Sequence, residues 1–153
     1  MEHPVRILEA SITDVPLIAP LFDAYRVFYQ AASDLDGATA FLSARLSAGQ
    51  SRIFLAVQEG PVPVAAGFTQ LYPSFSSVSM KRLWILNDLY VALAFRKAGV
   101  GAALMERARR FALEDGSKGL SLATQTGNAT AQALYERQGY LKDTEFFHFH
   151  LVF

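Results

Sequence analysis

A pair of glycines between a strand-like segment and a helix-like segment most limits what this chain can fold into. Residues 96–101 read RKAGVG, with two positive charges just before Gly99 and Gly101. Glycine lets a ligand approach backbone N–H groups, and a helix dipole favours negative charge at its start. The apolar segment 82–91 precedes the pair, and a run with apolar residues at helical spacing follows it. The pattern predicts a strand, a phosphate-binding turn and a helix; the alternative is a glycine-rich helix start that serves close packing.

The residues around the glycines separate three kinds of phosphate site. A nucleoside triphosphate loop needs Gly-Lys-Ser or Gly-Lys-Thr, but Ala102 follows Gly101. A dinucleotide fingerprint needs a third glycine at position 104, where this chain has leucine. The third kind needs only open backbone amides and nearby positive charge, which Arg96 and Lys97 supply. It suits a pyrophosphate without a metal.

The remaining periodicity predicts an α/β protein with a mixed sheet covered by helices. The length of 153 residues suits a single domain over 1–153. Helices are expected after Thr13 as N-cap, over about 36–48, after Gly99 and after Asn128. A Ser-rich connection is expected at 73–81. Strands are expected at 5–10, 51–58, 62–72, 82–91, 118–125 and 144–153.

Composition argues against several classes of function. Lys plus Arg equals Asp plus Glu at 14 each, which disfavours nucleic acid as the main partner. The absence of cysteine excludes a thiol nucleophile, a cysteine-based zinc site and disulfides. No apolar stretch approaches the roughly 20 residues of a membrane-spanning helix. With no signal peptide visible, the sequence predicts a cytoplasmic protein.

Two motifs resemble the acetyl-CoA-binding motifs of the GNAT superfamily of N-acetyltransferases. The pattern Arg96-x-x-Gly99-x-Gly101 follows the strand LNDLYV and opens an amphipathic helix. Asn128 then opens the next helix, and Tyr135 lies seven residues later in NATAQALYERQGY. The predicted order of strands and helices also matches the family, so the resemblance covers essentially the whole chain. It implies the GNAT fold, a mixed sheet of about six to seven strands flanked by about four helices.

The resemblance implies how acetyl-CoA would be bound. The strand backbone at Leu89, Tyr90 and Val91 would pair with the pantetheine arm, where this strand and the segment 118–125 splay apart. Asn128 would hydrogen-bond the pantetheine or its neighbouring loop. The pyrophosphate would be held beside Arg96 by the amides of Lys97, Ala98, Gly99, Val100, Gly101 and Ala102.

Acetyl transfer needs a neutral amine, a donor for the oxyanion and a proton for the departing thiolate. Without cysteine there is no cysteinyl acyl-enzyme, so direct attack of the amine in a ternary complex is expected. Backbone N–H groups of 87–91 can serve the oxyanion. The resemblance implies that Tyr135 lies near the thioester sulfur, and a phenol of pKa about 10 suits the thiolate. The alternative role is packing, because Ala131 and Leu134 share its helix stripe.

The sequence constrains the general base and the acceptor site less than it constrains the acetyl-CoA site. Where the polyamine acetyltransferases of this family carry a Glu-Asp pair, this chain has Asn87 and Asp88. Asp88 is expected either to act as a base through water or to anchor the sheet by hydrogen bonds. In the family the first two helices wall the acceptor site, and aromatic rings and acids can hold a cationic amine there. The residues predicted to bind the acceptor are Tyr29, Asp34 and Asn87.

These observations predict an acetyl-CoA-dependent N-acetyltransferase acting on a primary amine. The alternative is a non-catalytic acyl-CoA-binding or regulatory module on the same fold. His148 and His150 share a face of the expected last strand, but no third ligand stands nearby, so no metal site is predicted. The segment SFSSV and the apolar last strand suggest a homodimer. The sequence leaves the acceptor open among polyamines, amino acids, aminoglycosides and proteins.

Overall fold

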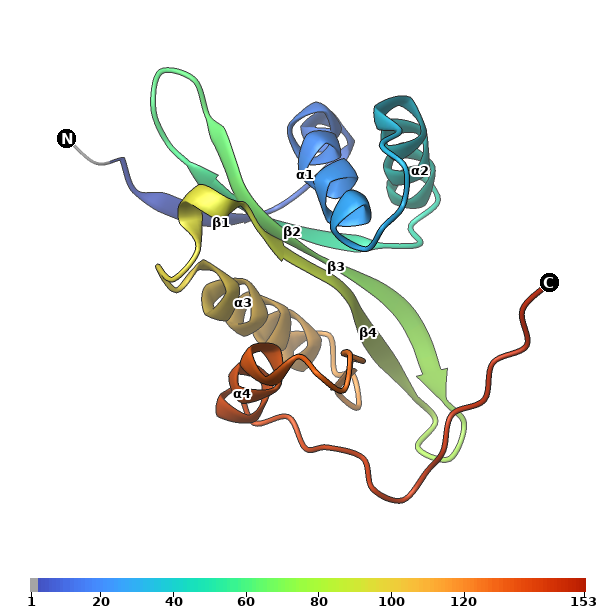
Figure 1. The fold of residues 1–153 in the computed structure, drawn as a ribbon. Helices are drawn as coiled ribbons and strands as arrows, with labels where there is room; N and C mark the ends of the chain where they lie inside the picture. The colour runs from blue at the N-terminus through green and yellow to red at the C-terminus, as the bar shows by residue number, and fades with distance from the viewer. Residues whose placement is uncertain (1–2) are drawn as a thin grey trace. The chain divides into compact units, whose positions relative to one another are not determined.

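A five-stranded sheet forms the centre of the first of two units in the computed structural model, which describes residues 3–153 (Figure 1). The first unit runs to Ala123, and the second is Thr124–Phe153. The second unit contains one helix, α4 (Ala129–Arg137). The elements of the first unit are β1 (Val5–Glu9), η1 (Ile12–Asp14), α1 (Val15–Phe28), α2 (Leu35–Ser47), β2 (Arg52–Gln58), β3 (Val64–Ser76), β4 (Lys81–Val91), η2 (Leu93–Phe95), α3 (Val100–Glu114) and β5 (Leu120–Ser121).

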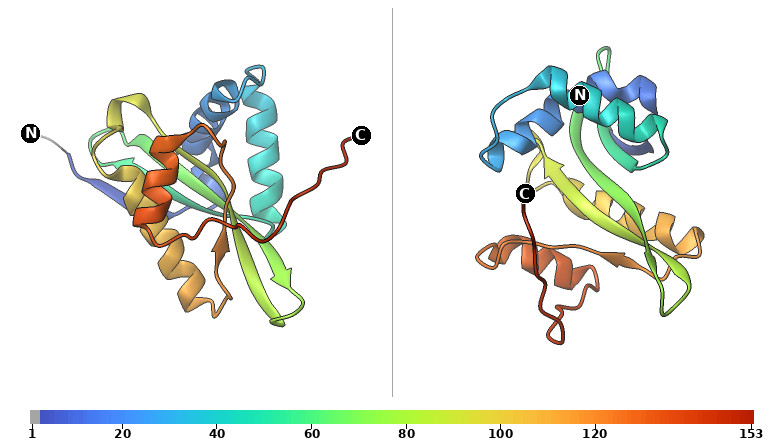
Figure 2. Two further views of the ribbon diagram at one scale, coloured as in Figure 1. Left: turned by 60° about the horizontal axis from the view of Figure 1, so that its bottom comes forward. Right: turned by 90° about the vertical axis from the view of Figure 1, so that its right-hand side faces the viewer.

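Helices cover both faces of the sheet, as the apolar sequence of β2 requires. The strands lie in the order β1-β2-β3-β4-β5, antiparallel except for the parallel pair β4 and β5. Ile53, Leu55 and Val57 belong to the core beneath α1 and α2, whereas the Phe54 ring packs 5.5 Å from that of Phe111 on α3. An unbroken apolar run is typical of a strand buried on both faces. Figure 2 shows the α1–α2 layer and α3 on opposite faces of the sheet.

The hairpin between β3 and β4 is longer than the sequence predicts. The segment 73–81 is mostly strand instead of a connection, because β3 continues to Ser76 and β4 begins at Lys81. Pro73 lies inside the ladder, opposite Trp84. The fixed φ of proline still fits extended backbone, so Pro73 removes one donor without ending the strand.

The first helix begins one residue later than the sequence predicts. Thr13, the expected N-cap, lies in the turn η1, and Asp14 is the N-cap of α1. The Ser11 N–H donates to the Asp14 carboxylate at 2.8 Å, which closes the turn before the helix. Pro16 lies in the first turn of α1, where its missing N–H is not needed.

The prediction of a last strand at 144–153 is wrong, so the sheet has fewer strands than expected. These residues form no strand, and the expected strand 118–125 is reduced to Leu120–Ser121. His148 therefore lies in extended chain, with Nε2 3.6 Å from Asp143 Oδ2. A segment with strand propensity becomes a strand only where an edge pairs with it.

Gly67 of β3 lies where α3 approaches the sheet. A Cβ at this position would stand 2.8 Å from the Tyr90 carbonyl oxygen and 3.3 Å from Leu104 Cδ1. Because the first contact is backbone, we expect Gly67→Ala to lower the free energy of unfolding by about 1–3 kcal/mol. Urea unfolding followed by the fluorescence of Trp84, the only tryptophan, measures this loss. Gly119→Ala is the control, because nothing lies within 4 Å of a Cβ there; equal losses in the two variants would contradict the prediction.

Candidate functional site

A β-bulge in β4 positions the polar residues that the sequence singled out. Gln70 pairs with Asp88 and Leu71 pairs with Leu86, so Asn87 is an extra residue on β4. A bulge bends its strand and redirects the neighbouring side chains. Asn87 is exposed, whereas Asp88 beside it is only 4% exposed. The bulge thus accompanies a carboxylate that is buried in the protein.

Both carboxylate oxygens of Asp88 accept hydrogen bonds. Gln70 Nε2 donates to Oδ2 at 2.8 Å, and Asn87 Nδ2 donates to Oδ1 at 3.0 Å. The hydroxyl of buried Thr69 donates to the Asp88 backbone carbonyl at 2.8 Å. Both oxygens of this buried side chain therefore have hydrogen-bond donors. The carboxylate is held in one orientation beside the bulge.

Two half-buried tyrosines respond to this charge. Burial, and then the charge of Asp88 and a hydrogen bond with it, raises the pKa of Tyr25 above its ordinary range. Burial, followed by the charge of Asp88, raises the pKa of Tyr72 to about 12. Both phenols therefore keep their protons at neutral pH and remain hydrogen-bond donors.

Gln70 has one buried acceptor atom that is not satisfied. Its Nε2 is used by Asp88, but its Oε1 is buried and has no hydrogen-bond partner among residues 3–153. Leaving a buried carbonyl oxygen without a donor costs about 1–3 kcal/mol. An amine that entered here would supply the missing donor next to a negative charge.

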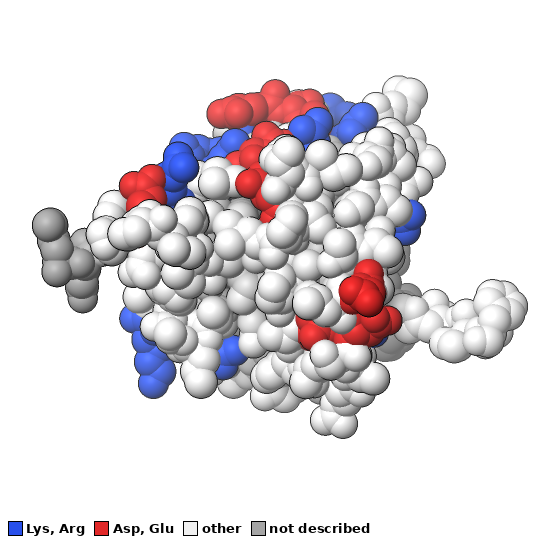
Figure 3. Space-filling model, turned by 90° about the horizontal axis from the view of Figure 1, so that it is seen from above, with Lys and Arg blue, Asp and Glu red and all other residues white. Residues whose placement is uncertain are grey.

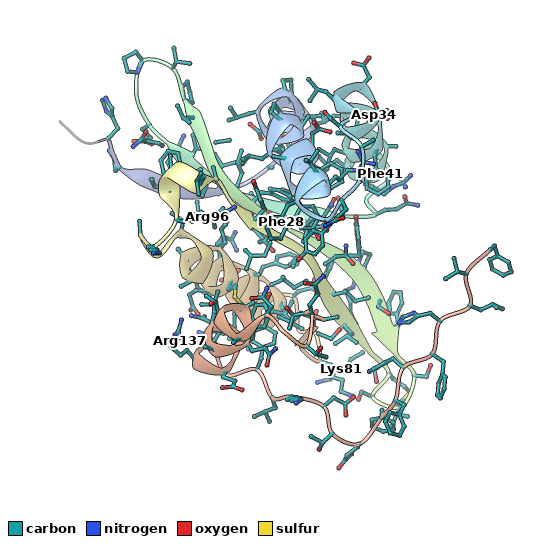
Figure 4. All side chains as sticks on the ribbon, viewed as in Figure 1. Phe28, Asp34, Phe41, Lys81, Arg96 and Arg137 are labelled. Carbon is teal, nitrogen blue, oxygen red and sulfur yellow. The ribbon has the colours of Figure 1, made fainter. Side chains whose placement is uncertain are left out.

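Aromatic rings extend from this cluster along α1. The Tyr25 ring lies 6.2 Å from Tyr90 and 5.0 Å from Tyr29, and the Tyr29 ring lies 5.2 Å from Phe28. Tyr29 and Phe28 are 50% and 61% exposed. The rings thus run from the buried charge to the surface at the end of α1, where Figure 4 shows Phe28. The face of the molecule seen in Figure 3 carries charge of both signs around an uncharged middle.

Asp34, predicted to bind the acceptor, holds the connection between α1 and α2. Its Oδ1 accepts from the Gly37 N–H at 2.9 Å as the N-cap of α2 (Figure 4). Its own N–H donates to Asp23 at 2.7 Å. The Ser33 hydroxyl, and then this N–H, holds the pKa of Asp23 below its usual value. The Asp34 carboxylate is therefore occupied in capping a helix.

The glycine turn before α3 is open, as the sequence predicts. Gly99 is the N-cap of α3 with φ 81°, no side chain caps the helix, and nothing lies within 4 Å of a Cβ at Gly99. The Ala103 N–H is bonded to the Gly99 carbonyl at 3.0 Å, whereas the amides before it start the helix. Lys97 also has a left-handed backbone, with φ 62°. The turn offers unpaired N–H groups at the positive end of a helix dipole, which suits an anion.

Arg96 connects this turn to the end of β4. Its Nε donates to the Val91 carbonyl at 2.9 Å, and its guanidinium lies 5.5 Å from the centre of the Tyr90 ring. Figure 4 shows Arg96 at the start of the turn. The predicted phosphate turn and the predicted pantetheine strand are therefore tied together.

The far edge of β4 is open at Leu89, Tyr90 and Val91. On one side these residues pair with β3, but β5 pairs only with Trp84 and Ile85. Within the residues that the structure describes, β4 thus has no ladder partner on its β5 side from Leu86 onward. β4 and β5 are therefore unpaired beside Leu89–Val91, where the resemblance to the family implies that the strands splay apart. An extended molecule with amide groups can add along such an edge.

The second unit holds the other two predicted residues. Asn128 is the N-cap of α4, and its Oδ1 accepts from the Ala131 N–H at 3.1 Å. Gln132 Nε2 donates to the carbonyls of the loop before α4 at 3.2 and 3.0 Å. Tyr135 is half-buried, with its ring 6.2 Å from that of Tyr140. Burial, followed by the charge of Tyr135, raises the pKa of Tyr140 to about 12.

Two residues of the Asp88 cluster, Gln70 and Tyr72, are not among those predicted from the sequence. Gln70 stands alone as an amide side chain in the apolar segment 62–72, and this was the available signal. Tyr72 gave none, because a tyrosine near a strand end is ordinary. Among residues 3–153, no group of three or more His, Cys, Asp or Glu could hold a metal, and no helix has the length and apolar character needed to span a bilayer.

Comparisons with known proteins agree with this geometry. The profile of the acetyltransferase (GNAT) family matches residues 18–140. The uncharacterized N-acetyltransferase YhfO of Bacillus subtilis (strain 168) is 49% identical over 145 residues, 95% of each chain. A crystal structure of a "probable acetyltransferase" is 40% identical with a TM-score of 0.91, over 97% of each chain.

A more distant structure shares the fold. Aminoglycoside N-acetyltransferase AAC(6')-Iy in complex with CoA has a TM-score of 0.80 at 18% identity, and the match covers 99% of this chain and 97% of that one. The family profile and the relative at 49% identity carry the assignment. The chain belongs to the GNAT family and is an N-acetyltransferase.

Proposed function

We propose that this protein transfers the acetyl group of acetyl-CoA to a primary amine by direct attack, with both substrates bound together and without a metal. The observation that carries the proposal is the arrangement of β4. The strand places the buried carboxylate of Asp88 immediately before the open edge at Leu89–Val91. One strand therefore offers a charge for the amine and an edge for the thioester.

Acetyl-CoA supplies an activated thioester and a thiol that leaves. In the proposal the backbone of Leu89–Val91 pairs with the pantetheine arm, and the amides of 97–102 bind the pyrophosphate beside Arg96 and Lys97. The open space at Gly99 and the uncapped start of α3 support this role. Asn128 donates through Nδ2, because its Oδ1 already caps α4. CoA bound to AAC(6')-Iy, a protein of the same fold, is consistent with this assignment.

The amine is proposed to bind at the Asp88 cluster. Asp88 attracts the cationic form, Gln70 Oε1 accepts one of its hydrogens, and Asn87 and Tyr29 form the exposed border. The amine must lose a proton before it attacks, and Asp88 receives this proton through water. The neutral nitrogen then bonds to the carbonyl carbon, and a backbone N–H of 87–91 stabilises the negative charge on the carbonyl oxygen. The C–S bond breaks as the carbonyl re-forms, Tyr135 gives its proton to the departing sulfur, and the nitrogen's second proton returns to Tyr135 through water.

Release of free thiol from acetyl-CoA in the presence of amines tests the proposal. The chain has no cysteine, so every thiol detected comes from the co-substrate. We expect release to depend on a primary amine from a panel of polyamines, amino acids, aminoglycosides and peptide N-termini. Binding of acetyl-CoA without thiol release for any member of the panel would contradict the proposal.

Lys97→Glu tests the phosphate turn. Reversing this charge should raise the KM for acetyl-CoA about tenfold, which corresponds to about 1.4 kcal/mol, and should leave kcat nearly unchanged. Lys81→Glu is the control, because Lys81 is an exposed residue at the start of β4. This substitution changes the net charge of the protein by the same amount. An equal rise in both variants would show that net charge, and not the turn, binds the anion.

Tyr135→Phe tests the proton donor. Removing the phenol should lower kcat about a hundredfold, the usual contribution of a general acid, while the Kd for acetyl-CoA stays the same. Tyr140→Phe is the control from the same unit, because the Tyr140 hydroxyl is buried without a partner among the described residues. If Tyr135→Phe kept the kcat of the parent, Tyr135 would have no part in the chemistry.

Asp88→Asn tests the amine site. The change keeps the shape of the side chain but removes its charge, so the KM for the amine should rise about tenfold. Asp34→Asn is the matched control, and it should affect the cap of α2 but not the KM. An unchanged amine KM in Asp88→Asn would overturn the assignment.

A further inference from the structure

Arg45 on α2 has a buried hydrogen-bond donor that is not satisfied. Its Nε is buried and has no hydrogen-bond partner among residues 3–153. The guanidinium lies 5.0 Å from the centre of the Phe41 ring, one turn earlier on α2 (Figure 4). Phe41 in turn stacks on Phe22 of α1, with the ring centres 5.8 Å apart. The rings therefore hold a positive charge beside α1, and its unsatisfied donor suits an anion that supplies oxygen atoms.

This positive charge lies on the same side of the sheet as Asp88. Phe68, Gln70 and Tyr72 follow one another at every second position of β3 and so share a face. Phe68 belongs to the core beneath α1 and α2, and Gln70 donates to Asp88. Burial and then the charge of Asp88 raise the pKa of Tyr72, whereas the charge of Arg45 lowers it. The phenol of Tyr72 is thus close enough to both charges to respond to both.

The two unsatisfied atoms on this side of the sheet have opposite requirements. Gln70 Oε1 needs a donor, and it belongs to the side chain that donates to Asp88. Arg45 Nε needs an acceptor. An ammonium group supplies donors and a positive charge, whereas a carboxylate supplies acceptors and a negative charge. A single molecule that carries both groups satisfies both atoms and pairs with both charges.

We infer that the acceptor is a free amino acid, with its ammonium group at Asp88 and Gln70 and its carboxylate at Arg45. The inference rests on the amine site of the proposed function and adds a residue that determines specificity. A guanidinium binds a carboxylate through two parallel hydrogen bonds, which fixes its orientation as well as its charge. The reaction remains the acetyl transfer described above, and the product is the N-acetyl amino acid.

Acceptors with several positive charges match this side of the sheet less well. The acids of the α1–α2 connection are already occupied. Asp23 accepts from the Ser33 hydroxyl and from the Asp34 N–H, and Asp34 caps α2. A second ammonium group of a polyamine or an aminoglycoside would find no free carboxylate at these positions and would be repelled by Arg45. An amino acid with an uncharged side chain brings one positive and one negative charge.

Thiol release with amino acids and their carboxamides tests the inference. The two members of each pair differ only at the carboxylate, so the comparison isolates the group assigned to Arg45. For the best amino acid we expect a kcat/KM about tenfold above that of its carboxamide, the effect of one hydrogen bond between charged groups. The amine of the carboxamide is less basic and more often neutral at neutral pH. Easier deprotonation therefore cannot produce this preference.

Arg45→Gln should remove the preference. The variant should lower kcat/KM for the amino acid about tenfold and leave the value for the carboxamide nearly unchanged. Arg107→Gln is the matched control, because the Arg107 guanidinium also lies over a ring, 4.5 Å from the centre of Phe54, but on the α3 side of the sheet. It should keep the preference. An equal loss for both substrates in Arg45→Gln would show that Arg45 only packs on Phe41 and would overturn the inference.

Calorimetric titration in the presence of CoA, which allows no turnover, separates this inference from the proposed function. At about pH 6 both amines are protonated, so the amino acid should bind about tenfold more tightly than its carboxamide. A polyamine, an aminoglycoside or a carboxamide that is acetylated as well as the best amino acid would overturn the inference and leave the proposed function standing. Preferential binding of the amino acid without thiol release from any amine would support the amino acid site and contradict the proposed function.

Discussion

The buried charge of Asp88 is the constraint on which the site depends. A carboxylate removed from water persists only where donors surround it. Here Gln70 donates from the neighbouring strand, Asn87 donates as the extra residue of the bulge itself, and Tyr25 forms a hydrogen bond from α1. A regular ladder would have no extra residue at this point. The bulge therefore supplies one of the donors to the buried carboxylate, and both features lie in β4 just before its open edge.

In the proposed mechanism this arrangement places the chemistry of donor and acceptor on one continuous segment. Asp88 precedes the open edge at Leu89–Val91, and Arg96 ties the end of that edge to the glycine turn. The turn then starts α3, whose Leu104 is fully buried against the sheet near Gly67. A helix anchored in this way keeps its N-terminal amides in a fixed place. The packing of the core thus supports the geometry on which the proposed anion site relies.

Features that depend on residues close in sequence could be predicted, whereas features that depend on contacts between distant segments could not. The turn at Gly99 and the cap at Asn128 involve residues within a few positions, and both are confirmed. The contact of Gln70 with Asp88 depends on the register between two strands and on the bulge that shifts it. No local pattern encodes that shift. Asp34 was predicted only to bind the acceptor, whereas the structure shows its carboxylate as the N-cap of α2, a local role that the sequence also allowed.

The segment 144–153 shows a further limit of local patterns. Its alternation and composition encode a strand, yet within one chain no strand forms. Alternation specifies which face of a strand is buried, whereas a ladder also needs an edge to pair with. The helix starts at Gly99 and Asn128 need only residues a few positions away. A strand depends on a partner that no pattern within the segment itself can supply, so the pattern alone does not decide whether the strand forms.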